Sequence, residues 1–201
     1  MEGKNISKAV LISIRPEWVE KIANRWKTIE VRKAKPNLET PFKCYIYCTN
    51  TRPFLVWGDV FRGDWFTEFT HLLGYGRAEA DRIWDVFNGH VVGEFVCDRI
   101  DTIKPEMEPY GTYDVDDDFM EQTRLVDGAL WNYGKGATLY GWHISKLEIY
   151  DTPKSLSIFK GLCKIEADCG CCPYYNYTKM DCGGRTIRRP PQSWCYVEEL
   201  K

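Results

Sequence analysis

Hydrophobic and polar residues alternate along several short segments of this chain. These segments are residues 10–15 (VLISIR), 43–49 (KCYIYCT), 91–98 (VVGEFVCD), 140–150 (YGWHISKLEIY) and 194–198 (WCYVE). A period of two, with many β-branched and aromatic residues, is typical of β-strands that bury one face. In the second segment Tyr45 and Tyr47 should share one face of the strand, while Cys44, Ile46 and Cys48 share the other.

Helical spacing replaces alternation directly after the first of these segments. Pro16 suits the first position of a helix, because its missing N–H is not needed there. Residues 29–32 then have the character of a short second strand. The residues expected on the buried face of the helix are Trp18, Val19, Ile22, Ala23 and Trp26.

Two longer stretches interrupt the strand pattern. Residues 52–90 hold many aromatic residues without strict alternation, so we interpret them as an insertion that contains a helix over 78–87. A further helix is predicted over 119–131, capped by Asp117 or Asp118. Short strands with one early helix and with helices in the excursions predict an α+β fold. We expect a small mixed β-barrel, in one domain over residues 1–201, rather than a parallel doubly wound sheet.

Charge and hydropathy limit the classes of function. The formal net charge is −2 and the pI is about 6.0, so bulk electrostatics give no reason to expect tight nonspecific binding of nucleic acid. No apolar stretch approaches the roughly 20 residues that span a membrane, and the first residues lack the apolar region of a signal peptide. We therefore expect a cytoplasmic protein.

Three charged residues stand close together where the early helix gives way to the short strand. They are Lys27, Glu30 and Arg32 in the run WKTIEVR. Side chains two apart on a strand face the same side, so Glu30 and Arg32 should project together with Lys27 beside them. Such a triplet can clamp an anionic or amide-bearing ligand, or move a proton. A surface strand that carries a salt bridge explains the same residues equally well.

The cysteines fall into two groups. Cys44, Cys48 and Cys97 lie in apolar strand-like runs and should be small buried residues. The segment 160–185 holds a Cys-x-x-Cys pair with the spacing of metal ligands, and zinc is the metal expected for a tetrahedral thiolate site. Free or redox-active thiols and a disulfide remain alternatives. The proposed zinc ligands are Cys163, Cys169, Cys172 and Cys182, with Cys171 as the alternative to one of them.

A loop that precedes the last strand has the composition of a binding surface. Residues 188–194 (RRPPQSW) combine two cations, a stiff pair of prolines, hydrogen-bonding side chains and an aromatic ring. An arginine can pair with phosphate and a tryptophan can stack on a base. The alternative is a rigid loop whose tryptophan fills one end of the barrel. The residues expected to line a cleft with the charged triplet are Tyr47, Arg189, Gln192, Ser193 and Trp194.

Several of these segments together match a known pattern. The matching runs, in chain order, are VLISIRPEWVEKIANRWKTIEVRK, YIYCT, GHVVGEFVCDRI, YGWHISKLEIYDTPKSL and RRPPQSWCYVEEL. Over nearly its whole length the chain resembles the ASCH domain, a branch of the PUA-like β-barrel superfold, and particularly its phage-borne members. The hallmark of that family is Gly-x-Lys-x-x-Glu-x-Arg. Lys27, Glu30 and Arg32 match its last three named positions, while Arg25 replaces the glycine.

The resemblance implies a cleft that binds RNA, a nucleotide or a modified nucleobase, in the host cytoplasm if the protein is phage-encoded. Some similar proteins are enzymes, either amidohydrolases that act on an acylated nucleoside or ribonucleases, and Lys27 and Glu30 would then be catalytic. The amidohydrolases use a threonine where this chain has Glu30, so the triplet favours binding over catalysis. A third possibility is a phage protein that binds and inhibits a host factor through residues 52–90.

Overall fold

The structure is a computed structural model that describes residues 7–51, 88–106, 111–126, 128–162, 175–176, 181–182 and 185–200. Most of the predicted insertion, including the helix expected over 78–87, lies outside these residues. So does most of the cysteine-rich segment. Among the described parts of the chain, no helix is long and apolar enough to cross a membrane.

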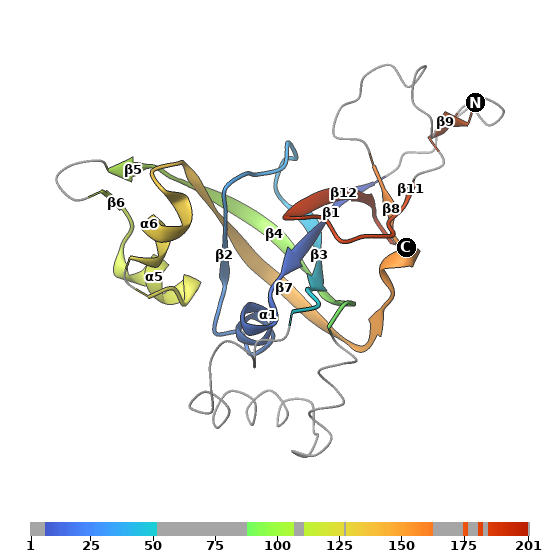
Figure 1. Ribbon diagram of the computed structural model, residues 1–201, viewed down its shortest axis with the longest axis horizontal. Coiled ribbons are helices and arrows are strands. Elements are labelled where there is room, and N and C mark those ends of the chain that lie inside the picture. Colours follow the sequence, from blue (N-terminus) through green and yellow to red (C-terminus); the bar gives the residue numbers. More distant parts are fainter. Residues whose placement is uncertain are drawn as a thin grey trace, which may run out of the picture.

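One mixed sheet organises the molecule (Figure 1). Its eight strands follow the order β11-β8-β12-β1-β3-β4-β7-β2, and within the described ranges the ladder ends at β11 and β2 without closing on itself. Only the β1–β3 pair in this sheet is parallel. The strands are β1 (Lys8–Ile14), β2 (Ile29–Arg32), β3 (Phe42–Cys48), β4 (Val91–Ile103), β7 (Leu139–Lys154), β8 (Lys160–Gly161), β11 (Arg185–Thr186) and β12 (Trp194–Glu198).

Short helices and hairpins complete the described structure, and the predicted α+β class is confirmed. In Figure 1, α5, α6, β5 and β6 gather at one end of the long β4 and β7 strands, and α1 lies near β2. The helices are α1 (Pro16–Ala23), α5 (Asp117–Thr123), α6 (Ala129–Gly134) and the 3-10 turn η2 (Leu156–Ile158). The two small hairpins pair β5 (Pro105–Glu106) with β6 (Thr112–Tyr113) and β9 (Tyr175–Asn176) with β10 (Asp181–Cys182).

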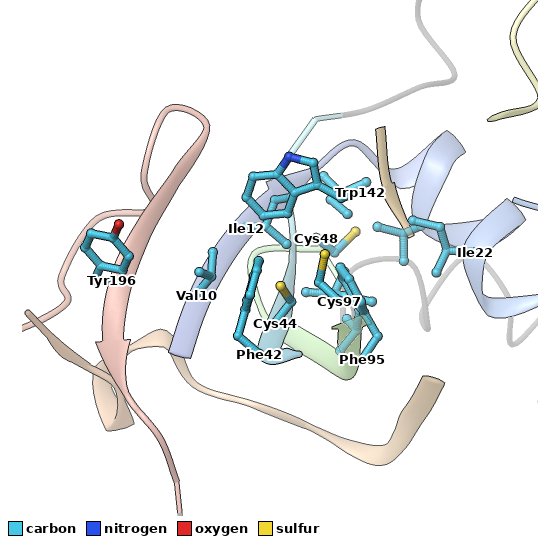
Figure 2. Close-up of a cluster of buried hydrophobic side chains, with 14 residues drawn as sticks. Val10, Ile12, Ile22, Phe42, Cys44, Cys48, Phe95, Cys97, Trp142 and Tyr196 are labelled. Carbon is cyan, nitrogen blue, oxygen red and sulfur yellow. The ribbon is translucent and has the colours of Figure 1, made fainter. Parts of the chain in front are cut away.

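Both faces of β3 are buried, in two different hydrophobic clusters. Tyr45 and Tyr47 enter one cluster, and Cys44, Ile46 and Cys48 enter the other, as the alternation predicts. The second of these clusters also receives α1 and the buried indole of Trp142 on β7. Figure 2 shows the sulfur atoms of Cys44, Cys48 and Cys97 among the apolar side chains of Ile12, Ile22, Phe42, Phe95 and Trp142. The predicted burial of these three cysteines is confirmed.

A third cluster attaches the helical excursion, the segment that carries α5 and α6 between β6 and β7, to the edge of the sheet. Phe119 and Leu130 from the two helices pack against Ile29 on β2 and Leu139 on β7. The contact is close because Gly141 carries no side chain: a Cβ there would lie 2.8 Å from the Phe119 ring. The excursion therefore lies directly behind the strand that carries Glu30 and Arg32.

The prediction of one helix over 119–131 is wrong, because this stretch forms two helices. The chain leaves α5 at Arg124, in the left-handed region with φ 55°, and it enters α6 from Gly128 at φ 74°. The N-cap of α5 is Asp116 rather than either predicted aspartate, and its carboxylate accepts from the backbone N–H of Phe119 at 2.7 Å. The Asp-Gly dipeptide at 127–128, a turn signal, is the sequence feature that marks the break.

The early helix is shorter than its apolar pattern suggests. It ends at Ala23, and its buried face holds Val19, Ile22 and Ala23. Trp26 lies beyond the helix and is 37 % exposed, so the prediction that it belongs to the buried face is wrong. The chain turns before the periodicity can place that residue against the core.

Candidate functional site

A cavity of about 380 Å³ opens where the end of β1, the start of α1 and the strand β2 meet. Its volume lies within the usual range of small-molecule sites. All three members of the charged triplet line it. The full lining is Ser13, Ile14, Arg15, Trp18, Lys27, Glu30, Val31, Arg32, Thr49, Thr51, Tyr133 and Gln192.

A helix-ending turn brings the triplet to this cavity. The N–H of Trp26 donates to the carbonyl of Lys21 and the N–H of Arg25 donates to that of Ile22, both at 2.9 Å. This is the Schellman pattern, which requires a left-handed residue after the helix. Arg25 supplies it with φ 62°, although glycine is the residue that adopts this conformation most easily. The turn reverses the chain and starts β2 beside α1.

Lys27 is buried and fully engaged. Its Nζ donates to the carbonyl oxygens of Ile29 at 2.7 Å and Thr123 at 2.8 Å, and it lies 3.3 Å from Oε2 of Glu30. An ammonium group has three donors, so each has a protein acceptor. The residue is only 2 % exposed, and this burial lowers its pKa, while the neighbouring Glu30 carboxylate opposes the shift.

Glu30 lies between two cations. Its Oε1 is 2.9 Å from Nη2 of Arg32, and its Oε2 faces Lys27. The same Nη2 of Arg32 donates to the carbonyl of Ser13 at 2.7 Å, which ties β2 to the end of β1. Among the described residues, Nε of Arg32 is buried without a hydrogen-bond partner. The carboxylate is therefore fixed in place by charge on both of its oxygens.

Aromatic rings flank the charged floor. Trp18 comes from α1, and the Nζ of Lys27 lies 5.1 Å from the centroid of its ring. Tyr133 comes from α6, and Nζ of Lys33 lies 5.0 Å from its ring centroid. Burial raises the pKa of Tyr133, with smaller opposed effects from Arg32 and Glu30. Flat apolar walls next to hydrogen-bonding groups are what a stacked heterocycle requires.

Of the residues predicted in the loop 188–194, only Gln192 lines the cavity. The loop is tied to the site nonetheless, because Ser13 donates through its N–H to the carbonyl of Ser193 at 2.9 Å and through its hydroxyl to that of Pro191 at 2.7 Å. Arg189 is exposed and outside the lining. Trp194 is instead partly buried and packs against the core, with its ring centroid 6.0 Å from that of Trp142.

Tyr47 also lies away from the cavity. It is buried in the cluster on the opposite side of β3 from Cys48. Glu94 pairs with Lys43 at 2.7 Å and accepts a hydrogen bond from Tyr150. His143 faces Asp101, with 2.6 Å between Nε2 and Oδ2. These groups do not belong to the site.

Sequence reasoning missed several lining residues. Arg15 follows β1, and Thr49 and Thr51 follow β3. The two strands are parallel neighbours, so their carboxyl ends meet at one edge of the sheet, which is where clefts form. That rule could have identified them once the parallel pairing was known. Tyr133 gave no signal, because the predicted helix ended at 131, whereas α6 continues to Gly134.

The proposed zinc ligands lie outside the described residues, except for the backbone of Cys182 in β10. The described residues contain no group of three or more His, Cys, Asp or Glu side chains suited to a metal. The zinc site therefore stays a prediction from the sequence.

Comparison with known proteins finds similarity to solved structures, of which three are described below. No protein family matches the chain by its sequence profile, and no curated protein matches it. The ASCH protein of Zymomonas mobilis is 14 % identical with a TM-score of 0.45, covering 95 % of this chain and 88 % of that one. Its serine-to-alanine variant is 15 % identical with a TM-score of 0.44, covering 95 % of this chain and 89 % of that one. Its tyrosine-to-phenylalanine variant is 15 % identical with a TM-score of 0.42, covering 74 % of this chain and 76 % of that one.

Proposed function

We propose that this chain is an ASCH-type domain that binds RNA or a nucleotide, with one base held in the cavity beside β2. The single observation that carries the proposal is the carboxylate of Glu30, fixed between Lys27 and Arg32 on the floor of a cavity that has aromatic walls. The match of Lys27, Glu30 and Arg32 to the family motif, whose first position lies two residues after α1, adds support.

The chemistry of the lining suits a nucleotide. A carboxylate accepts hydrogen bonds from base amines, and tryptophan and tyrosine rings stack on any base. Arg15 stands at the rim with its side chain 72 % exposed, where it can meet a phosphate. Thr49, Thr51 and Gln192 add groups that donate or accept. A neutral stacking region with a cationic rim fits a base and its phosphate together.

The geometry favours binding over hydrolysis. A lysine nucleophile or base needs a lowered pKa, and burial gives Lys27 that property. Its three N–H donors, however, are all directed to Ile29, Thr123 and Glu30, so the amine has no group free for a substrate in this arrangement. In this arrangement Lys27 holds Glu30 and the turn before β2 in position.

Exposed cavity residues provide the test. Arg15→Ala and Tyr133→Ala remove parts of the rim and wall without touching the triplet. Each should weaken binding of a short fluorescein-labelled single-stranded RNA, read by fluorescence anisotropy, by about fivefold or more. Arg99→Ala is the matched control. Like Arg15, which pairs with Glu17, Arg99 has an exposed side chain (66 %) and a carboxylate partner, Asp101. It contacts His143 and does not line the cavity.

The control should change the dissociation constant by less than about twofold at the same ionic strength, because it removes the same charge from outside the cavity lining. An absence of saturable binding by the unaltered protein would contradict the proposal. An equal loss in Arg15→Ala and Arg99→Ala would instead indicate nonspecific attraction to positive charge.

A further inference from the structure

The Glu30 carboxylate is fixed in orientation as well as in position. A carboxylate is an acceptor of hydrogen bonds only, with about four lone-pair sites on its two oxygens. Arg32 takes one site on Oε1 at 2.9 Å, and Lys27 takes one on Oε2 at 3.3 Å. Because each cation holds a different oxygen, rotation of the group about its last bond is restricted, and one acceptor site per oxygen remains for a ligand.

Two fixed acceptors side by side are satisfied by two N–H donors side by side. Among the unmodified neutral nucleobases, guanine alone presents such a pair, its N1–H and its exocyclic amine. Adenine and cytosine place an amine next to a ring-nitrogen lone pair, and uracil places one N–H between two carbonyls. With any of these three, one oxygen of Glu30 would stay unpaired or would face another acceptor, which is costly in a buried site.

Guanidinium groups also carry paired N–H donors, but the local charge opposes them. Lys27 and Arg32 bring two positive charges against the single negative charge of Glu30, while Arg15 at the rim is paired with Glu17 at 3.8 Å. A cation entering the cavity would meet this excess in partly buried surroundings, where repulsion is screened less than in water. A neutral base edge avoids the cost, and its phosphate gains from the same charges.

The remaining edge of guanine is also complementary. Its O6 acceptor lies directly beside N1–H, so a donor next to Glu30 completes the match. Arg32 lies two residues further along β2 on the same side, and its guanidinium has N–H groups besides Nη2. We infer that this cavity selects guanine, recognised along its amine-bearing edge by Glu30. This inference rests on the proposed function and names the base that the site prefers.

Calorimetric titration of the unaltered protein with nucleoside 5′-monophosphates tests the inference. Guanosine monophosphate should bind about tenfold more tightly than inosine monophosphate, which differs only by lacking the exocyclic amine. The adenosine, cytidine and uridine nucleotides should bind at least as weakly as inosine monophosphate. Free arginine should not compete with guanosine monophosphate.

The 1-methyl derivative of guanosine monophosphate tests the other donor, because methylation removes N1–H. It should lose the same advantage of about tenfold. Equal affinity for the guanosine and inosine nucleotides would overturn the inference while leaving the proposed function in place. If neither mononucleotides nor the short RNA bind, both proposals fail.

A substitution separates the carboxylate from the rest of the cavity. Glu30→Gln keeps the shape but turns one acceptor into a donor, so the ratio of guanosine to inosine affinity should fall below about threefold. Glu94→Gln is the control, since Glu94 also pairs with a lysine but lies outside the cavity, and it should keep the full ratio. If Glu30→Gln does not fold, the nucleotide series on the unaltered protein still decides the question.

Discussion

The ammonium group of Lys27 lies 2.8 Å from the carbonyl oxygen of Thr123, the last residue of α5. A carbonyl at a helix C-terminus has no partner within the helix and carries the negative end of the helix dipole, so a buried cation is a favourable cap. The same ammonium group faces Glu30. Lys27 thus connects the helical excursion to the floor of the cavity.

This connection makes Lys27 important for stability. Lys27→Met keeps the aliphatic stem but leaves two buried carbonyls and one oxygen of Glu30 without their donor, and it should lower the free energy of unfolding by about 3 kcal/mol. Urea denaturation followed by circular dichroism measures the change. Lys21→Met is the control, because Lys21 also lies near the Trp18 ring, at 5.8 Å, and should shift the value by less than about 0.5 kcal/mol. Similar losses in both variants would contradict the capping role.

Arg25 offers a change in the opposite direction. A residue other than glycine in the left-handed region costs about 1 kcal/mol, and Arg25 has φ 62°. Arg25→Gly should therefore raise the free energy of unfolding by roughly 0.5 to 1 kcal/mol, measured by thermal or urea denaturation. Arg25→Ala loses the same contact to the Leu147 carbonyl but keeps a Cβ, so it should give no gain. A gain in the alanine variant would show that the side chain, not the backbone, is the source of strain.

Much of the sheet could be predicted, because alternation reports directly on burial. The segments 43–49 and 194–198 agree closely with β3 and β12. Strands β4 and β7 extend further than predicted, to Ile103 and Lys154, because their ends pair with each other across register shifts. Such pairing depends on the partner strand, so no local pattern could show it. The break between α5 and α6, by contrast, has a local signal, the Asp-Gly dipeptide at 127–128.

The candidate site was predicted mainly where its residues are neighbours in sequence, although Gln192 from the loop 188–194 was also predicted and lines the cavity. Lys27, Glu30 and Arg32 fall within one short run, and their meeting at the cavity follows from strand geometry. Tyr47 follows the alternation of faces along β3, so its side chain is buried in a hydrophobic cluster and not in the cavity. Tyr133 reaches the cavity through tertiary packing of α6, a relationship that only the folded chain reveals.

Alkaline pH should destabilise the protein through its buried thiols. Burial raises the pKa of Cys48 and of Cys97 to about 12 from an ordinary value of 9.0. Above pH 9.0 the unfolded thiols ionise while the folded ones stay protonated, so their contribution, fully present below that pH, is lost as the pH rises toward 12. The free energy of unfolding should fall by about 1.4 kcal/mol per pH unit for each thiol across this window.

A variant isolates the thiol contribution from other groups. Lys27 acts with the opposite sign, because its lowered pKa makes the folded state lose a proton first. Urea unfolding of Cys48→Ala with Cys97→Ala, at about pH 8 and about pH 10.5, should show a shallower decline than the unaltered protein. The comparison concerns the slope alone, since the substitutions also leave cavities. Parallel slopes would mean that these thiols ionise equally in both states.

The cysteine-rich segment leads to a prediction about metal content. Protein purified without added zinc should contain about one equivalent of zinc by elemental analysis, because four thiolates hold this ion tightly. Cys169→Ser with Cys172→Ser should reduce it below about half an equivalent, while Cys195→Ser, outside the segment, should not. A metal content below half an equivalent in the unaltered protein would count against the site.

The central claim is that a nucleotide occupies the cavity beside β2, and an NMR titration tests it most directly. Addition of guanosine monophosphate to isotope-labelled protein should shift the signals of Trp18, Thr49 and Gln192, which line the cavity from three separate segments of the chain. Signals of Arg99 and His143, in a polar group outside the lining, should stay unchanged. Shifts centred on Arg99 and His143, or no shifts at a saturating concentration, would contradict the account.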